Sequence, residues 1–280
     1  MTSHRAFDRT LPFRERFAGA ALVTGASAGI GEAFARALAA RGMDLVVVAR
    51  RRDRLVALAN ELATAHRVRV EPIAHDLGRP DVHRSLPAAV AEVGLDVGLL
   101  VNNAGFGSYG RFVDSDIDDQ ARMVDLNCRV PVVLSRAFLP GMLARGAGAI
   151  VLVASIAGYQ PTPLLATYGA SKAFDLMFGE ALWAELRGEG IAVLALSPGS
   201  TPTEFQHVAG TERLRPPGLT TTAAQVVETA LDALGKKPSV VPGVANALLV
   251  AGSRFAPRKW VAMLSHRANR RGGAEEGGRS

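Results

Sequence analysis

A tyrosine and a lysine four residues apart are the residues of this sequence whose types and spacing could do chemistry. Tyr168 and Lys172 would lie one turn apart on one helix face, and twelve residues separate Ser155 from Tyr168. An ammonium beside a phenol favours the phenolate, so we expect Lys172 to lower the pKa of Tyr168 from its ordinary value near ~10 towards neutrality. Such a tyrosine can exchange a proton with a carbonyl or alcohol oxygen that a serine hydroxyl holds in place. An isolated tyrosine and lysine at this spacing are more often unrelated residues on a helix surface. Other features of the sequence must therefore show whether this pair is catalytic.

A glycine-rich turn follows the first apolar segment. Residues 24–31 read TGASAGIG and lead into a stretch of helical composition. Glycines let the backbone approach a pyrophosphate closely, and a helix N-terminus offers free N–H groups and a favourable dipole. The spacing is G-x-x-x-G-x-G rather than the G-x-G-x-x-G of the common dinucleotide fingerprint. In its strand–turn–helix setting it predicts a nucleotide site lined by Gly25, Ser27, Gly29, Ile30 and Gly31.

The end of the second apolar segment indicates which nucleotide is bound. A site that prefers NAD would place a carboxylate here for the ribose 2′-hydroxyl. This chain instead has Ala49 followed by Arg50, Arg51 and Arg52. Guanidinium groups pair bidentately with phosphate, so we expect the 2′-phosphate of NADP(H). Arg50 is the first candidate for that contact and Arg51 the second, whereas Arg52 and Arg54 are expected to lie on the solvated start of a helix.

These residues need a sheet to position them. Apolar runs rich in valine, leucine and isoleucine recur, and continuous apolar strands are typical of a parallel sheet buried on both faces. The runs lie at 21–23, 45–48, 68–73, 97–101, 149–153, 191–196 and 240–241, and helices are expected over 29–41, 52–65, 80–93, 117–144 and 165–188. We therefore predict an α/β fold: a doubly wound (Rossmann) seven-stranded parallel sheet in three α/β/α layers, forming a single domain.

The segments outside this pattern define the predicted boundaries. Residues 1–17 are expected to form an N-terminal extension and residues 18–243 the catalytic domain. Residues 200–222 are rich in proline, glycine and threonine, and they are expected to form a loop at the ligand-binding edge of the sheet that acts as a lid. Residues 244–280 form a basic tail, disordered at its end, whose apolar and basic residues suit either a packing or subunit-contact helix, which we favour, or a helix lying on an anionic membrane.

Composition excludes several classes of function. The net charge is +6, but residues 252–280 contain seven Lys/Arg and two Glu, which gives 7 − 2 = +5, so the remainder offers no basic face for nucleic acid. The six histidines show no metal-ligand spacing, so we predict no metal. The lone Cys128 excludes an internal disulfide and suits a small buried thiol in a reducing compartment. Because neither a secretory signal nor a membrane span is evident, we expect a cytoplasmic protein.

Several motifs now occur together in one order. TGASAGIG, Asp76-Leu77, the Asn-Asn-Ala-Gly run at 102–105, Asn127, Ser155, Tyr168-x-x-x-Lys172 and Pro198-Gly199 follow one another along residues 18–242. In this order and approximate spacing the chain resembles the short-chain dehydrogenases/reductases, of the shorter single-domain type. The resemblance implies an NADP(H)-dependent oxidoreductase that interconverts a ketone or aldehyde and an alcohol, with the carbonyl-reducing direction expected.

The resemblance also implies roles for single residues. Tyr168 is the acid/base, Lys172 lowers its pKa and binds the nicotinamide ribose, Ser155 orients the reacting oxygen, and Asn127 supports a water-linked proton relay. The remaining cofactor contacts are implied for Asp76 with Leu77 near the adenine, for Asn103, Ala104 and Gly105 along the cleft, and for Pro198, Gly199 and Thr203 near the nicotinamide. Thr203 is the least secure of these, because Thr201 is close enough to compete.

The alternative is a non-catalytic NADP(H)-binding redox sensor or scaffold of the same fold. Such a protein has no need of Asn127, Ser155, Tyr168 and Lys172 together. Pro163, Leu164 and Leu165 suggest a largely apolar substrate pocket. Family members usually pair through helices equivalent to 117–144 and 165–188, so a homodimer or homotetramer is expected.

Overall fold

The computed structural model describes residues 5–211, 219–253 and 255–273. A parallel seven-stranded sheet forms its centre, in the order β3-β2-β1-β4-β5-β6-β7. The strands are β1 (Ala20–Thr24), β2 (Leu45–Ala49), β3 (Val70–Ala74), β4 (Val97–Asn102), β5 (Gly148–Val153), β6 (Ile191–Leu196) and β7 (Ser239–Val240). This confirms the predicted fold class, and the order reverses between β1 and β4, where open α/β sheets bind ligands.

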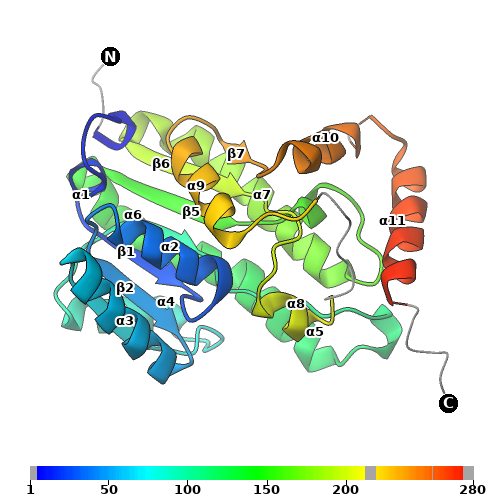
Figure 1. The fold of residues 1–280 in the computed structure, drawn as a ribbon, viewed down its shortest axis with the longest axis horizontal. Coiled ribbons are helices and arrows are strands. Elements are labelled where there is room, and N and C mark those ends of the chain that lie inside the picture. Colours follow the sequence, from blue (N-terminus) through cyan, green and yellow to red (C-terminus); the bar gives the residue numbers. More distant parts are fainter. Residues whose placement is uncertain (1–4, 212–218, 254, 274–280) are drawn as a thin grey trace.

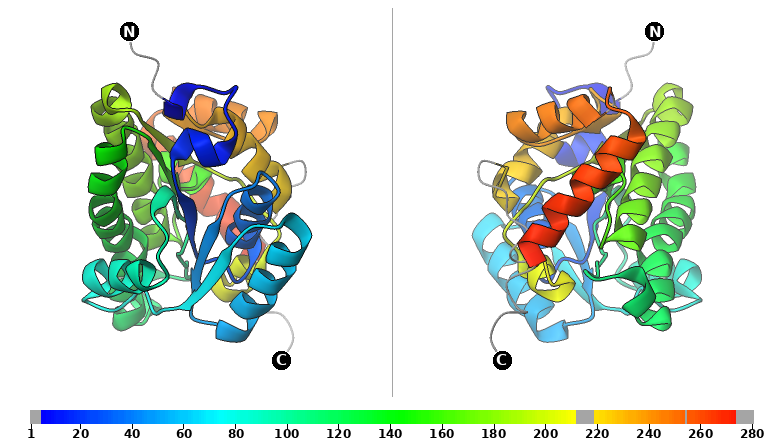
Figure 2. Two further views of the ribbon diagram at one scale, coloured as in Figure 1. Left: turned by 90° about the vertical axis from the view of Figure 1, so that its left-hand side faces the viewer. Right: turned by 90° about the vertical axis from the view of Figure 1, so that its right-hand side faces the viewer.

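Helices cover both faces of the sheet, so that three layers result (Figures 1 and 2). One layer contains α2 (Gly29–Ala39), α3 (Arg52–His66) and α9 (Ala223–Ala233), and the other contains α4 (Val82–Glu92), α5 (Ile117–Val124), α6 (Val130–Arg145) and α7 (Ala166–Leu186). Side chains alternate along each strand between two cores: Val23 packs into the first, and Leu22 into the second. Continuous apolar strands are the consequence, since both faces of the sheet are buried.

The helix predicted over 117–144 is divided in the structure. Asp125–Arg129 form a π-helical turn between α5 and α6, in which the Val130 N–H bonds to the Asp125 carbonyl. Pro131 follows and has no N–H, so it cannot make the α-helical hydrogen bond to the carbonyl of Asn127. Asn127 therefore sits in the irregular turn, of a kind that occurs frequently at functional sites.

The N-terminal segment packs on the domain. Residues Phe13–Phe17 form α1, preceded by a 3₁₀ turn at Arg5–Phe7, and Phe17 is fully buried. The buried Arg16 guanidinium donates hydrogen bonds to the carbonyls of Ala6 (2.7 Å) and Leu234 (2.9 Å). Burial lowers its pKa to about 10. Described residues of the predicted extension thus contribute to the core.

The C-terminal segment forms two helices, α10 (Val244–Ser253) and α11 (Arg258–Gly273). Figure 2 shows α11 running obliquely across one face of the molecule. The predicted disorder falls mainly on residues 274–280, outside the described residues. Of the predicted lid, 200–222, residues 212–218 also lie outside them, and α8 (Glu204–Ala209) interrupts the expected loop. Among the described helices, none combines the length and apolar character that crossing a membrane requires.

Candidate active site

A cleft of about 1560 Å³ lies at the carboxyl edge of the central strands. Its walls come from the turn after β1, from the ends of β2, β4 and β5, from α7, and from the segment after β6. All the predicted site residues except Asn127 and Gly31 line it. The fold therefore brings the two predicted sites into one cavity: the glycine-rich turn of residues 24–31, called the phosphate turn below, and the tyrosine–lysine pair.

The turn after β1 has the backbone that its glycines require. Gly25 and Gly29 have φ angles of 67° and 62°, in the left-handed region that favours glycine. A Cβ on Gly31 would collide with the Gly25 carbonyl and the Asn103 amide. Ala28, the residue before α2, offers no side-chain cap to the helix N–H groups. Free N–H groups at a tight turn suit a phosphate.

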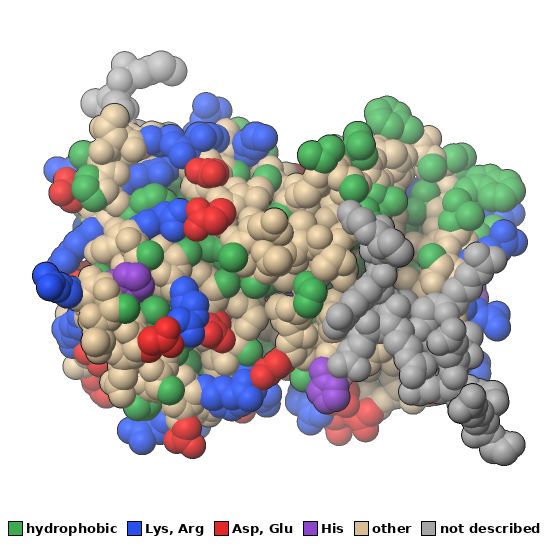
Figure 3. Space-filling view, in the orientation of Figure 1, with side chains coloured by type: hydrophobic (Ala, Val, Ile, Leu, Met, Phe, Trp, Pro, Cys, Tyr) green, Lys and Arg blue, Asp and Glu red, His purple; other side chains and the backbone are tan. Residues whose placement is uncertain are grey.

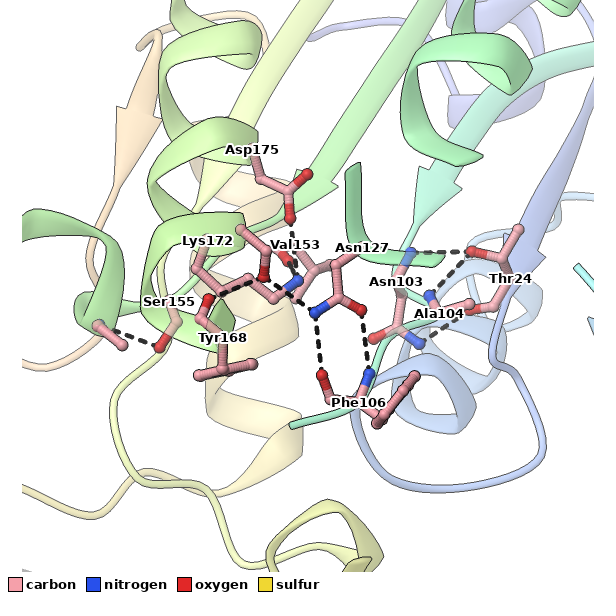
Figure 4. A network of polar contacts seen from close by, with 12 residues as sticks. Thr24, Asn103, Ala104, Phe106, Asn127, Val153, Ser155, Tyr168, Lys172 and Asp175 are labelled. Carbon is pink, nitrogen blue, oxygen red and sulfur yellow. Dashed lines mark hydrogen bonds and ion pairs between the residues drawn. The ribbon is translucent and has the colours of Figure 1, made fainter. Parts of the chain in front are cut away.

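Asn103, which follows the neighbouring strand β4, and Thr24, the last residue of β1, brace this turn. The Asn103 side-chain amide donates to the Thr24 carbonyl at 2.8 Å. The Thr24 hydroxyl accepts from the backbone N–H groups of Asn103 (2.9 Å) and Ala104 (3.0 Å) (Figure 4). It also donates to the Val101 carbonyl. Sequence reasoning assigned no role to Thr24, although its hydroxyl ties β1 to the end of β4.

The arginines after β2 reach the same turn. The Arg51 guanidinium donates to the Ser27 hydroxyl at 2.9 Å and pairs with Glu204 of α8 at 2.7 Å. Arg54, which was predicted to lie on the solvated start of the helix, pairs with the same carboxylate. Arg50 is exposed and lines the cleft. Two guanidinium groups and a serine hydroxyl thus surround one corner of the cleft.

The segment after β3 contributes Asp76 and Leu77. The Asp76 carboxylate accepts the Gly78 N–H at 3.0 Å, which fixes the turn. Leu77 is buried and packs against the second core, while both residues line the cleft. His75 lines it too, and its Nε2 lies 3.0 Å from the Ser85 hydroxyl.

Ser155, Tyr168 and Lys172 meet at the opposite wall (Figure 4). Ser155 follows β5, and Tyr168 and Lys172 lie on the inner face of α7. The Lys172 ammonium is buried and donates to the Val153 carbonyl at 2.8 Å and to the Asp175 carboxylate at 2.9 Å. The Tyr168 ring contacts the Phe205 ring at a centroid distance of 5.3 Å. This arrangement puts a phenol, a hydroxyl and a fixed cation in one place.

The direction of the tyrosine titration differs from the prediction. Burial raises the pKa of Tyr168 above its ordinary value, although Lys172 and a hydrogen bond with Ser155 act in the opposite direction. Lys172 thus has the expected effect, but burial outweighs it. For Lys172, burial acts to lower the pKa. Asp175 and Tyr168 favour the ammonium and outweigh burial, so the pKa of Lys172 is raised. At neutral pH the pair is a phenol beside an ammonium, which is the form a general acid needs.

Asn127 is fully buried in the π-helical turn. Its side-chain amide donates to the Phe106 carbonyl (2.9 Å) and to the Ser171 hydroxyl (3.0 Å), and its side-chain oxygen accepts the Phe106 N–H. Ser171 in turn donates to the Tyr168 carbonyl. Asn127 therefore ties the segment after β4 to the helix that carries Tyr168, while Pro131 leaves its backbone carbonyl outside the α-helical pattern.

The segment after β6 lies across the cleft. Pro198 and Gly199 line it, and Thr203 begins α8 with its side chain against Gly29 of the phosphate turn. Thr201 is buried, and its hydroxyl donates weakly to the Gly199 carbonyl at 3.3 Å. Contact with the phosphate turn favours Thr203 over Thr201 as the residue facing a bound dinucleotide.

A model of the family described as short chain dehydrogenase matches residues 19–213. The chain belongs to the short-chain dehydrogenase family. It is 39% identical over 199 residues to a short chain dehydrogenase of Pseudocercospora fijiensis and 38% identical over 194 residues to a very-long-chain 3-oxoacyl-CoA reductase of Anas platyrhynchos. Each match covers 68% of this chain but only 64% and 62% of those relatives, so it spans less than two thirds of their length.

Solved structures resemble this short-chain dehydrogenase over most of its length. A 7β-hydroxysteroid dehydrogenase structure superposes with a TM-score of 0.84 at 27% identity, over 91% of this chain and 100% of that chain. A short-chain dehydrogenase from Sphingobium yanoikuyae in complex with NADPH has a TM-score of 0.72 at 32% identity, over 93% and 98%. The first superposition extends the likeness well beyond residue 213.

The C-terminal helices of this dehydrogenase are the part of the cleft that sequence reasoning missed. Leu248 and Leu249 of α10 and Val261 and Leu264 of α11 line it. Asn269 fastens α11 to the domain, because its amide donates to the Pro163 carbonyl at 2.8 Å and its carbonyl accepts from the Tyr109 hydroxyl at 2.8 Å. The apolar residues spaced along 244–264 could have indicated a helix that lines the cleft. The basic residues between them instead led to the prediction of a packing or subunit-contact helix, or of a helix lying on a membrane.

The residues present fit a nicotinamide dinucleotide, as the family implies. The turn at Gly25–Gly31 is a cradle that a Cβ would fill, and it leads into an uncapped helix N-terminus beside two arginines. In contrast, no cluster of His, Cys, Asp and Glu suited to a metal ion occurs among the described residues. Cys128 is half-buried, and burial together with Asp175 raises its pKa to about 11, so its thiol is not a nucleophile at neutral pH.

Proposed function

We propose that this protein is an NADP(H)-dependent oxidoreductase that interconverts a ketone or aldehyde and an alcohol. The observation that carries the proposal is the meeting of Ser155, Tyr168 and Lys172 in the cleft that also contains the phosphate turn. A nicotinamide bound along that cleft supplies or accepts the hydride. The NADP(H) preference is supported by Arg50 and Arg51 near Ser27, since guanidinium groups suit a 2′-phosphate.

The chain's own residues do the remaining work. Ser155 and Tyr168 hold the substrate oxygen by hydrogen bonds, and Tyr168 gives its proton to that oxygen as negative charge develops on it. The Lys172 ammonium stabilises the tyrosinate that results. Asn127 fixes the segment after β4 against α7, so that the geometry is set before the substrate arrives. Because burial raises the pKa of Tyr168, the protonated form that carbonyl reduction requires is present at neutral pH.

The substrate that we propose is a bulky, largely apolar carbonyl compound. The support is the size of the cleft and its lining by Leu165, Phe205 and Val208 together with the apolar side chains of α10 and α11. The relatives include very-long-chain 3-oxoacyl-CoA reductases and the solved structures include a 7β-hydroxysteroid dehydrogenase, which are proteins named for large apolar substrates.

The experiment is a turnover assay with steroid ketones, long-chain 3-oxoacyl thioesters and small ketones. NADPH absorbance is followed for the wild type and for Tyr168→Phe. We expect NADPH consumption with at least one bulky ketone and none above background in the variant. Binding of NADPH without turnover of any ketone or alcohol would instead favour the redox sensor or scaffold.

The proposal also covers how the protein self-associates and where in the cell it is located. We propose a cytoplasmic homodimer or homotetramer that pairs through the outer faces of α5, α6 and α7. The support is a set of exposed apolar side chains on these helices, namely Val124, Leu143, Phe174 and Met177. Peripheral membrane contact through α10 and α11 is the less favoured partner surface.

A further inference from the structure

Asp175 lies one turn after Lys172 on α7, and no step described so far uses it. It is 2% exposed, and its Oδ2 accepts a hydrogen bond from the Lys172 ammonium at 2.9 Å (Figure 4). Its other oxygen, Oδ1, is buried with no hydrogen-bond partner among the described residues. A buried ion pair is often no more stable than an apolar pair of the same volume. A gain in stability therefore does not explain why a carboxylate is buried here. The contact of Asp175 with the Lys172 ammonium offers an explanation.

The geometry relates Asp175 to the whole reactive face. Tyr168, Lys172 and Asp175 occupy positions i, i+4 and i+7, so they share one side of the helix. An ammonium has three N–H donors. The Val153 carbonyl and Asp175 each take one, at 2.8 and 2.9 Å, while the ammonium also borders Gly105 on the cleft wall. These two hydrogen bonds leave the third N–H of the Lys172 ammonium free for the cleft, and they fix the direction in which it points.

We propose that Asp175 is a positioning residue: its carboxylate clamps the Lys172 ammonium against the end of β5, so that the remaining N–H faces the cleft. The proposal concerns the site of the proposed oxidoreductase function and rests on it only for the activity measurements. Loss of the clamp frees a flexible side chain from one of its two anchors. It also removes a negative charge that lies close to the ammonium.

That charge has a second effect, on Tyr168. Asp175 opposes the phenolate form and Lys172 favours it, so the two charges partly cancel at the phenol. The other titratable groups near this face are Cys128 from the π-helical turn and Tyr159, which packs with Leu176. The Cys128 thiol has its pKa raised to about 11, so it stays neutral in the working range. Asp175 is therefore the acidic neighbour whose charge reaches the pair.

The first test is a titration of the protein without cofactor or substrate. Tyrosinate absorbance of Tyr168 is isolated as the difference between a protein and its Tyr168→Phe counterpart, in the wild-type and Asp175→Asn backgrounds. Asparagine keeps the shape but not the charge, so the opposition of Asp175 to the phenolate is removed. Loss of Asp175 also lowers the pKa of Lys172, but the Tyr168 phenolate itself favours the ammonium, so Lys172 keeps its proton as Tyr168 loses its own. We expect the Tyr168 titration to move to lower pH by about one unit, a tenfold change in proton affinity.

The second test is the pH profile of ketone reduction. Reduction needs protonated Tyr168, so activity is lost as pH rises through its pKa, and in Asp175→Asn that loss should begin about one pH unit lower. We also expect a lower kcat and weaker NADPH binding, while Asp175→Glu, which keeps the charge, restores the profile. Glu180→Gln is the matched control, because this carboxylate of α7 accepts from Ser239 and not from Lys172.

The outcomes separate the inference from the proposed function. A Tyr168 titration that stays in place in Asp175→Asn, or moves to higher pH, would overturn the inference even if ketones are reduced. The same holds if Glu180→Gln shifts the profile equally. If the titration moves as expected but no ketone is turned over, the clamp stands and the proposed function fails. Thermal unfolding of each variant establishes that the folded protein is being compared.

Discussion

Tyr168 is subject to opposed influences, and their balance decides what it can do. Burial and Asp175 favour the phenol, whereas Lys172 and Ser155 favour the phenolate. Near neutral pH the balance leaves the proton on the oxygen, ready for transfer to a substrate. In the proposed reaction, the substrate oxygen gains negative charge and takes this proton. The Lys172 ammonium then stabilises the tyrosinate, an attraction that is weaker while Tyr168 is still a neutral phenol.

Replacement of Tyr168 by phenylalanine removes only the phenol oxygen and so tests whether that hydroxyl is the proton donor. The variant keeps the ring that contacts Phe205 and loses the proton donor. We expect kcat/KM for ketone reduction to fall by about 10²–10⁴-fold, the range typical of a positioned acid, with NADPH binding unchanged within a factor of about two or three. Steady-state kinetics and fluorescence titration measure the two quantities. Full turnover with normal NADPH binding would show that Tyr168 is not the acid.

The arginines after β2 allow a separate test of cofactor choice. We expect Arg50→Asp to weaken NADPH binding by more than tenfold relative to NADH, because a carboxylate repels a 2′-phosphate and accepts a 2′-hydroxyl. Arg51→Ala should have a smaller effect, since part of its guanidinium already pairs with Glu204. The matched control is Arg52→Ala. Equal losses for the two cofactors in Arg50→Asp would contradict the 2′-phosphate assignment.

Among the elements, the turn between β1 and α2 is the most constrained. Gly31 has no room for a Cβ, because the Gly25 carbonyl and the Asn103 amide lie against it. We expect Gly31→Ala to lower the free energy of unfolding by about 1–3 kcal/mol, as overpacking does, and to abolish dinucleotide binding. Gly188→Ala is the control, since nothing lies within 4 Å of the added Cβ. Chemical denaturation compares both, and a Gly31→Ala protein as stable as wild type that still binds NADPH would contradict the account.

The α11 helix is the element whose role in substrate binding can be tested alone. It lines the cleft with Val261 and Leu264 and is fastened by Asn269. We expect a chain ending at residue 253 to bind NADPH normally and to show at least a tenfold higher KM for bulky apolar ketones. The KM for small ketones should change much less. An equal change for both sizes, with cofactor affinity intact, would mean that α11 forms no part of the substrate wall.

Local pattern was enough to predict the sheet and the catalytic helix. Seven apolar runs matched seven strands to within a few residues. The five inner strands are buried on both faces and therefore apolar along nearly all of their length, whereas the edge strands β3 and β7 are only partly buried. The π-helical turn at Asn127 was missed because its cause, Pro131, disrupts one hydrogen bond without changing composition. The wall formed by α10 and α11 was missed because packing against a cleft depends on tertiary position, which the alternation of apolar and basic residues does not fix.

The balance of charges at the site also depends on tertiary packing, which local sequence pattern does not fix. The spacing of Tyr168 and Lys172 predicted the attraction between them but not the burial that outweighs it. Asp175 is three residues beyond Lys172, so the sequence held a signal for the pair. Whether such a pair is solvated or buried depends on what packs above it, here β5 and the π-helical turn.

At the scale of the molecule, most of the exposed large apolar side chains of the described residues lie on two surfaces, and Phe112, Val113 and Val208 lie outside them. One lies on the outer face of α5–α7, where Met177 is 56% exposed and Phe174 stacks on Phe178. The other covers α10, α11 and the connection between them, where Phe255 in the connection and Trp260 of α11 are 90% and 59% exposed. Figure 3 shows hydrophobic side chains gathered over this part of the molecule. No Asp or Glu occurs in residues 244–273, while Arg and Lys recur there. Two copies meeting face to face through α10 and α11 would bring like charges together, whereas the α5–α7 face carries both signs.

Single substitutions test the proposed pairing of subunits and the surface that carries it. We expect Met177→Glu to convert the oligomer into a smaller species in light scattering, since it places a charge in an apolar contact, and to leave NADPH binding intact. Phe255→Glu should leave the mass unchanged. If Phe255→Glu dissociates the protein and Met177→Glu does not, the subunits pair through the C-terminal helices. If the wild type is a monomer that sediments with anionic but not neutral vesicles, and Phe255→Glu abolishes this, then α10 and α11 contact membrane and the proposed oligomer is wrong.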